Sequence, residues 1–110
     1  MDGLICVAKP PGCTSHDVVQ ALRKILGMRR IGHCGTLDPD ASGVLLLAVG
    51  RATRFFPFLS GQDKVYRGEI RLGFSTDTYD ASGVRTSPEA EELPGEDRLA
   101  AAMKEMEGDI

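Results

Sequence analysis

The sequence has 110 residues, 42% hydrophobic and 26% charged, which predicts one soluble domain with a small core. No apolar run approaches the roughly 18 residues of a membrane span, and no basic stretch precedes an apolar one as in a secretory signal. Three cysteines without framework spacing exclude a disulfide scaffold and favour a reducing, cytoplasmic setting.

The net charge of −3 is unevenly distributed along the chain. Residues 1–56 hold seven Lys/Arg and four Asp/Glu, whereas residues 57–110 hold six and twelve. A positive half in an acidic molecule suits a polyanionic ligand on one face. Ordinary surface charge beside an acidic tail explains the same numbers, so composition leaves both interpretations open.

The first elements in chain order are a strand and a helix. Residues 3–8 form an apolar run that the Lys-Pro-Pro-Gly sequence at 9–12 stops, which predicts an internal strand ending in a turn. Residues 14–17 fit a capping box, and apolar side chains then recur at helical spacing as far as Leu26. Gly27 follows as a natural residue to end the helix.

A polar, glycine-rich loop and an apolar strand come next. The loop spans residues 32–43 and contains Asp38, which Pro39 follows with its fixed φ. The run 44–49 predicts a short buried strand, closed by Gly50. Asp38 is therefore expected on a stiff loop at the edge of an apolar wall, where a reactive carboxylate is partly shielded from water.

The second half of the chain is less regular. Residues 51–60 have helical character, and residues 65–74 alternate between apolar and polar, which predicts a half-exposed strand with Tyr66 on its apolar face. Residues 76–83 read as a polar turn. An acidic amphipathic helix is predicted for residues 99–106.

Two kinds of metal site, for calcium and for zinc, are candidates for the polar residues of the first half of the chain. The Asp-Pro-Asp-Ala-Ser-Gly sequence at 38–43 opens like a calcium loop, but its twelfth position is Val49 where a bidentate glutamate is needed. Four side chains supply zinc-type donors: Cys13, His16, His33 and Cys34. Their spacing lacks the paired pattern of zinc sites, so no metal is predicted.

Several motifs together resemble one family. They are Gly3-Leu-Ile with Lys9-Pro-Pro-Gly, Thr14-Ser-His-Asp-Val-Val, Gly32-His-Cys-Gly-Thr-Leu-Asp-Pro-Asp-Ala-Ser-Gly-Val-Leu, Gly50-Arg-Ala-Thr-Arg-Phe, Lys64-Val-Tyr-Arg and Leu72-Gly-Phe-Ser-Thr-Asp-Thr-Tyr-Asp-Ala-Ser-Gly. In this order they resemble the TruB-type tRNA pseudouridine-55 synthases, the bacterial enzymes more than the archaeal and eukaryotic guide-RNA-dependent relatives. The resemblance is continuous from about residue 3 to residue 83 and looser beyond.

The resemblance implies an isomerase that converts uridine to pseudouridine in the T-loop of tRNA, with Asp38 as the catalytic residue. A carboxylate suits this reaction as a nucleophile towards C1′ or C6, or as a base at the sugar, and the sequence leaves these routes open. The target base must leave the RNA loop to reach Asp38, which implies base flipping. Neither a metal nor a cofactor is implied, and no membrane partner.

The resemblance also implies further substrate contacts. His33 is expected to pack where the flipped base had been, and Tyr66 to stack on that base. By the same resemblance, Lys9 is expected to support the site rather than to react. Asp80 is expected to be a weaker contact to the substrate. Four arginines are expected at phosphates by their charge: Arg29, Arg30, Arg51 and Arg54.

The expected fold is α+β, part of the pseudouridine synthase fold with a mixed, largely antiparallel sheet flanked by helices. Residues 1–110 are expected to be the N-terminal portion of the catalytic domain, without its C-terminal half and RNA-binding extension. The chain by itself is then weak or inactive. Family members are mostly monomeric, but exposed sheet edges favour self-association here. The alternatives are a non-catalytic RNA-binding fragment and a structural or metal-binding domain.

Overall fold

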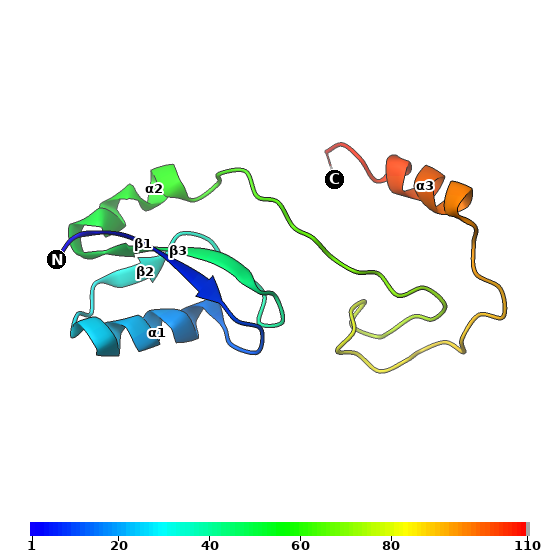
Figure 1. Cartoon of the computed structure of the whole chain (residues 1–110), viewed down its shortest axis with the longest axis horizontal. Coiled ribbons are helices and arrows are strands. Elements are labelled where there is room, and N and C mark those ends of the chain that lie inside the picture. The colour runs from blue at the N-terminus through cyan, green and yellow to red at the C-terminus, as the bar shows by residue number, and fades with distance from the viewer. Residues whose placement is uncertain (110) are drawn as a thin grey trace. The chain divides into compact units, whose positions relative to one another are not determined.

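The computed structural model describes residues 1–109 and divides into a first compact unit, Met1–Val65, and a second that begins at Tyr66. The elements in chain order are β1 (Gly3–Lys9), α1 (Ser15–Leu26), β2 (Ile31–His33), β3 (Gly43–Val49), the 3-10 helix η1 (Gly50–Phe55), α2 (Phe56–Leu59) and α3 (Glu96–Glu105) (Figure 1). Helices beside a small antiparallel sheet confirm the α+β class.

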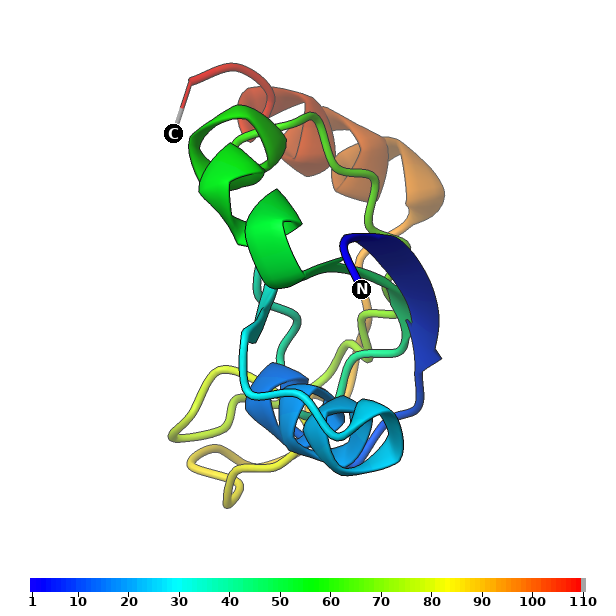
Figure 2. The same cartoon turned by 90° about the vertical axis from the view of Figure 1, so that its left-hand side faces the viewer.

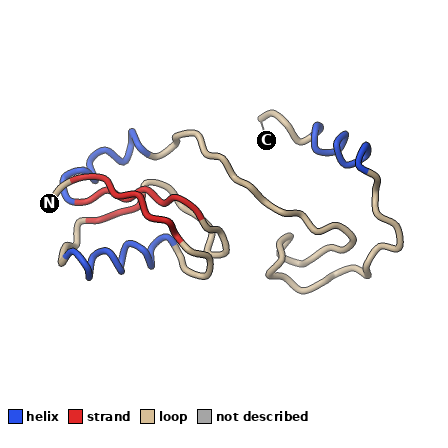
Figure 3. The backbone as a smooth tube through the Cα atoms, viewed as in Figure 1, coloured by secondary structure: helices blue, strands red, loops and turns tan. Residues whose placement is uncertain are grey.

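The sheet of the first unit has the order β1-β3-β2, with both pairs antiparallel (Figure 3). Gly3 lies opposite Val49 on β3, and His33 lies opposite Leu47. The apolar run of β3 is central, as its sequence predicts, and is buried from Leu45 onwards except for the half-buried Leu46. The prediction that residues 3–8 form an internal strand is wrong, because β1 lies at an edge and its side chains alternate in exposure as on a strand packed on one face.

Helix α1 begins and ends where its sequence predicts. The Thr14 hydroxyl accepts a hydrogen bond from the N–H of Asp17 (3.0 Å), and the Asp17 carboxylate accepts one from the N–H of Thr14 (2.9 Å), which completes the capping box. Gly27 ends the helix at a φ of 62°, a conformation that glycine adopts without steric cost.

The two faces of the sheet are covered by different helices. Helix α1 covers one face, and η1 with α2 covers the other, so the sheet lies between them in both views (Figures 1 and 2). The core under α1 consists of Val19, Ile31, Leu47 and Val49. Each such side chain stabilises the fold by roughly 1.5–3 kcal/mol through removal of apolar surface from water. The core on the opposite face is smaller and consists of Cys34, Ala48 and Ala52, with Phe56 and Leu59 packed against it.

Two glycines of the first unit have close neighbours where a side chain would begin. A Cβ at Gly32 would lie 2.5 Å from Cζ of Phe56, so the absence of a side chain lets this ring lie against β2. Gly50 has a φ of 62°, and a Cβ there would clash with the carbonyl oxygen of Met1 and the carboxylate of Asp2. The glycine after β3 therefore lets the chain turn into η1 beneath its own N-terminal residues.

Among residues 66–109, the second unit holds one helix, α3, which confirms the helix predicted at 99–106 and starts three residues earlier. The strand predicted at 65–74 is wrong: this segment is not a strand, and it makes no ladder with another described residue. Alternation of apolar and polar residues alone does not make a strand, because the N–H and C=O groups of an extended segment need a neighbouring strand as hydrogen-bond partner. The polar turn at 76–83 is present and closes with a bridge between Thr76 and Arg85. Over residues 1–109, none of the helices has the length and apolar character that a membrane crossing demands.

Candidate active site

Asp38 lies on the loop between β2 and β3, and its side chain is exposed. Its carbonyl oxygen accepts a hydrogen bond from the N–H of Ala41 (3.0 Å), which closes a turn over Pro39 and Asp40. The residues on either side of Asp38 are held by the first 15 residues of the chain. The loop is therefore fixed through its backbone while the carboxylate itself stays accessible.

Lys9 holds the loop on the C-terminal side of Asp38. It is the last residue of β1 and only 1% exposed. Its Nζ donates hydrogen bonds to the carbonyl oxygens of Pro10 (2.9 Å), Cys13 (2.7 Å) and Pro39 (3.1 Å). An ammonium group has three protons to donate, and all three have an acceptor here. The N–H of Gly12 also donates to Pro39 (2.8 Å), so the turn after β1 and the Asp38 loop form one hydrogen-bonded assembly.

Ser15 holds the loop on the N-terminal side of Asp38. This residue opens α1 and is 3% exposed. Its Oγ donates to the carbonyl oxygen of Leu37 (3.1 Å) and accepts from the N–H of the same residue (3.0 Å). Sequence reasoning missed Ser15, although a signal existed: Thr14 already caps the helix, which leaves the adjacent hydroxyl without a role in capping.

Replacing Ser15 by alanine is expected to lower the free energy of unfolding by about 1–3 kcal/mol, because both backbone groups of Leu37 lose a buried partner. Urea unfolding of the full chain measures this change, and amide exchange at Leu37 should accelerate. Ser42→Ala is the matched control, since Ser42 is an exposed serine before β3. Equal stability of the two variants would mean that the paired bonds contribute nothing net.

His33 ends β2 and is half-buried. Its Nδ1 lies 2.7 Å from the carbonyl oxygen of Gly35, and because a carbonyl only accepts, Nδ1 carries the proton. This bond fixes the ring orientation and leaves Nε2 for another partner. Lys64, which sequence reasoning did not single out, brings its Nζ to 3.2 Å from the position of a Cβ on Gly35. A cation therefore lies beside the loop that carries His33.

Tyr66 and Asp80 belong to the second unit, whose residues are described separately from those of the first unit. Tyr66 is 65% exposed, so it does not take the place on an apolar strand face that its sequence predicts. The Oδ1 of Asp80 accepts hydrogen bonds from the hydroxyls of Ser82 and Thr78 and from the N–H of Ser82 (2.9 Å). Asp80 thus organises its own turn, and its substrate contact stays a prediction.

The turn of Asp80 is expected to loosen in acid. The Ser82 and Thr78 hydroxyls, with the Ser82 N–H, hold the pKa of Asp80 below its ordinary value. A lowered pKa means that the stabilisation is present above the unfolded-state pKa of about 3.9 and is lost as the pH falls through the folded-state value. Amide exchange at Ser82 should therefore accelerate, relative to its intrinsic rate, below about pH 4.

Asp80→Asn should remove this acid transition, because an amide does not titrate in that range. Asp63→Asn, an exposed change outside the turn, should leave it in place. An unchanged transition in Asp80→Asn would assign it to another group.

The predicted phosphate contacts differ in their surroundings. Nε of Arg51 forms an ion pair with the carboxylate of Asp2 (2.8 Å), which also accepts from the Arg51 N–H. Nε of Arg30 donates to the hydroxyl of Thr53 (3.0 Å). Arg54 is exposed, and Arg29 lines a cavity at the end of α1. Within residues 1–109, no group of three or more His, Cys, Asp or Glu side chains is arranged to hold a metal ion.

Comparison of the sequence with known proteins shows the family to which the chain is related. The family model described as TruB family pseudouridylate synthase (N terminal domain) matches residues 23–110. The tRNA pseudouridine synthase B of Caldanaerobacter subterraneus subsp. tengcongensis is 49% identical over 110 residues, which are 100% of this chain and 39% of that protein. The enzyme of the same name from Bacillus thuringiensis is 53% identical over 108 residues, 98% of this chain and 33% of that protein. The chain therefore spans between a third and two fifths of these relatives' length.

Solved structures give the same result for the fold. The archaeal box H/ACA sRNP Nop10-Cbf5 complex contains a chain that matches with a TM-score of 0.65 and 35% identity, over 98% of this chain and 29% of that one. An H/ACA RNP bound to a substrate RNA containing 2′-deoxyuridine matches with a TM-score of 0.65 and 34% identity, over 98% of this chain and 28% of that one. Sequence motifs, family model and fold agree: the chain belongs to the TruB family of pseudouridylate synthases.

Proposed function

We propose that this chain is the N-terminal portion of a catalytic domain that isomerises uridine to pseudouridine in the T-loop of tRNA, with Asp38 as the catalytic carboxylate. The observation that carries the proposal is the two-sided anchoring of the Asp38 loop by buried Lys9 and Ser15, around an exposed carboxylate. A carboxylate held in this way can be presented to a substrate in one geometry. The names of the relatives support tRNA as the substrate.

The chemistry needs a carboxylate and no electron acceptor. The bond between N1 of uracil and C1′ of its ribose breaks, the base turns, and C5 bonds to C1′, while C5 loses a proton and N1 gains one. Substrate and product are isomers, so no redox cofactor enters the balance. Asp38 would act as a nucleophile towards C1′ or C6, or as a base at the sugar.

The remaining predicted residues fit roles around a flipped base. His33, with its ring oriented by Gly35, would occupy the place that the base leaves, and Tyr66 would stack on the base. Arg30 would contact a phosphate, and Lys9 would support the loop rather than the reaction. Asp80 would be a substrate contact of lesser weight. The three free cysteines suit a cytoplasmic enzyme.

We further propose that the rest of the pocket comes from residues beyond this chain, because the relatives are between two and three times as long. By itself the chain is then weak or inactive. The outer edges of β1 and β2 lack a partner strand among the described residues, which favours self-association of the isolated chain.

The test is to map pseudouridine at single-nucleotide resolution in unmodified tRNA after incubation with two proteins. One is the chain alone, and the other is a chimera in which the chain replaces the 110 aligned residues of the Caldanaerobacter enzyme. The chimera should convert the T-loop uridine, and the chain alone should convert little or none. An inactive, folded chimera beside an active parent enzyme would overturn the proposal.

A second candidate is a fragment that binds T-loop RNA without reacting. The observation that favours it is the segment between Asp17 and Asp38, which holds four cations and no acidic residue. Salt-sensitive binding of tRNA by the chain, with no product from the chimera, would support this candidate over the first.

A further inference from the structure

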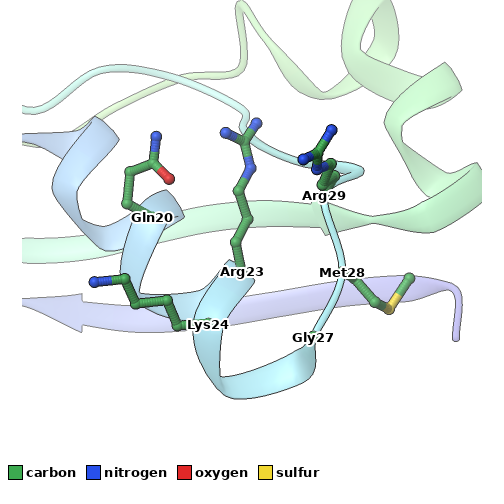
Figure 4. Close-up of a pocket in the computed structure, with 6 residues that line it drawn as sticks. All are labelled: Gln20, Arg23, Lys24, Gly27, Met28 and Arg29. Atoms are coloured by element: carbon green, nitrogen blue, oxygen red, sulfur yellow. The ribbon is translucent and has the colours of Figure 1, made fainter.

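An open cavity of about 570 Å³ lies along the C-terminal half of α1 and the residues that follow it, and Asp38 does not line it (Figure 4). The residues that line it are Gln20, Arg23, Lys24, Gly27, Met28 and Arg29. Three of these six carry a positive charge. Arg23 and Lys24 have so far been counted only among the four cations between Asp17 and Asp38, without a role of their own.

The fold gathers these side chains for a simple geometric reason. Positions 20, 23, 24 and 27 recur at the spacing that places residues on one face of a helix. Gly27 then turns the chain with its positive φ, so that Arg29 comes back beside the last turn of α1. Figure 4 shows the side chains of Gln20, Arg23 and Arg29 pointing the same way, which directs an amide and two guanidinium groups at one region.

The cations at this cavity have no acidic partner in the part of the chain that the structure describes. Within residues 1–109, no ion pair includes Arg23, Lys24 or Arg29. The negative end of the helix dipole stabilises Arg23 and Lys24 in the last turn of α1. It does not explain Arg29, which lies beyond the end of the helix.

Arg23 is held rather than free. Its Nη2 donates to the carbonyl oxygen of Ile31 (3.1 Å), while its buried Nε has no hydrogen-bond partner among the described residues. The guanidinium is thus positioned by the fold with donor capacity left over.

We propose that this cavity binds backbone phosphates of the RNA substrate, an inference that rests on the proposed function. The cavity is lined from Gln20 to the residues beyond α1, so along the helix it begins roughly 8 Å from Ser15 and extends past the helix end, roughly 17 Å from Ser15. Ser15 itself holds the residue before Asp38. Asp38 does not line the cavity, so the phosphates are expected to belong to nucleotides other than the flipped one. Such contacts position the RNA and do not read its sequence.

The test measures binding of a tRNA T-arm hairpin to the full chain across a range of salt concentrations. The variant is Lys24→Gln with Arg29→Gln, because both side chains are exposed and neither makes a described hydrogen bond. We expect affinity at low salt to fall about tenfold, and the slope of log K against log salt to decrease by about 0.9 for each phosphate that the variant no longer neutralises.

The matched control is Arg98→Gln with Lys104→Gln on α3, which removes the same charge elsewhere. It should change affinity by less than about twofold, as a loss of net charge alone would. Equal losses in both double variants would overturn the cavity as a site and assign the effect to net charge.

Activity of the chimera separates this inference from the proposed function. An active chimera whose RNA affinity is unaffected by the Lys24 and Arg29 changes would reject the phosphate site and keep the isomerase. An inactive chimera whose RNA affinity falls with these changes would keep the site and reject the isomerase.

Discussion

Replacing Asp38 by asparagine is expected to lower pseudouridine formation by the chimera at least about a thousandfold, the scale for loss of a nucleophile or general base. The amide has nearly the same shape as the carboxylate but neither accepts a proton at neutral pH nor attacks carbon. The side chain is exposed and the loop is held through Pro39 and Leu37, so the fold should be unchanged. RNA affinity should stay the same or rise, because a negative charge beside a polyanion is removed.

Asp40→Asn is the matched control, because Asp40 is an exposed aspartate on the same loop. Its rate should stay within about twofold of the unsubstituted chimera, since a solvated surface charge contributes little. Single-turnover rates with excess enzyme separate the chemical step from product release. If Asp38→Asn and Asp40→Asn react at similar rates, Asp38 is not the catalyst.

Replacing Lys9 by methionine is expected to lower the free energy of unfolding by about 2–4 kcal/mol. Three carbonyl oxygens lose a charged donor, and each such bond contributes about 1.5–3 kcal/mol. The total stays below their sum because Pro39 keeps its bond from Gly12, and because removal of a buried ammonium relieves its desolvation. Methionine has a similar length, so a cavity adds little.

Urea unfolding of the full chain measures the Lys9 effect. Lys24→Met is the control, since that lysine is exposed on the same unit and its loss should cost less than about 0.5 kcal/mol. In the chimera, Lys9→Met should also slow pseudouridine formation, because the Asp38 loop loses one of its anchors. A stable Lys9→Met protein with full activity would show that the bonds of Gly12 and Ser15 suffice to hold the loop.

Elements with a strong local signal were predictable from the sequence. The capping box at Thr14 and the glycine after Leu26 bounded α1, and the apolar run before Gly50 marked β3. The loop with Asp38 between β2 and β3 was also predicted as a loop. In each case the decisive information lies within a few residues of the element itself.

Features that depend on distant partners were not predictable in this way. The strand β2 is three residues long and includes Gly32, so it exists only because β3 lies beside it. The segment 65–74 has the alternation of a strand but no partner among the described residues. The burial of Lys9 depends on acceptors up to 30 residues away, and lysine is rarely buried. Ser15 acts through Leu37, 22 residues later.

The anchors of the Asp38 loop all precede it in the chain, which bears on the order of folding. Lys9, Gly12 and Ser15 are synthesised before Asp38, and β3, which completes the sheet, follows within about ten residues. When the first 50 residues have emerged from a ribosome, they thus contain the hydrogen-bond partners of Leu37, Asp38 and Pro39. Because short chain segments form contacts much faster than residues are added, the Asp38 loop can make these hydrogen bonds before α3 is translated. The later folding of the segments that follow, α3 among them, would then start from an Asp38 loop that is already formed.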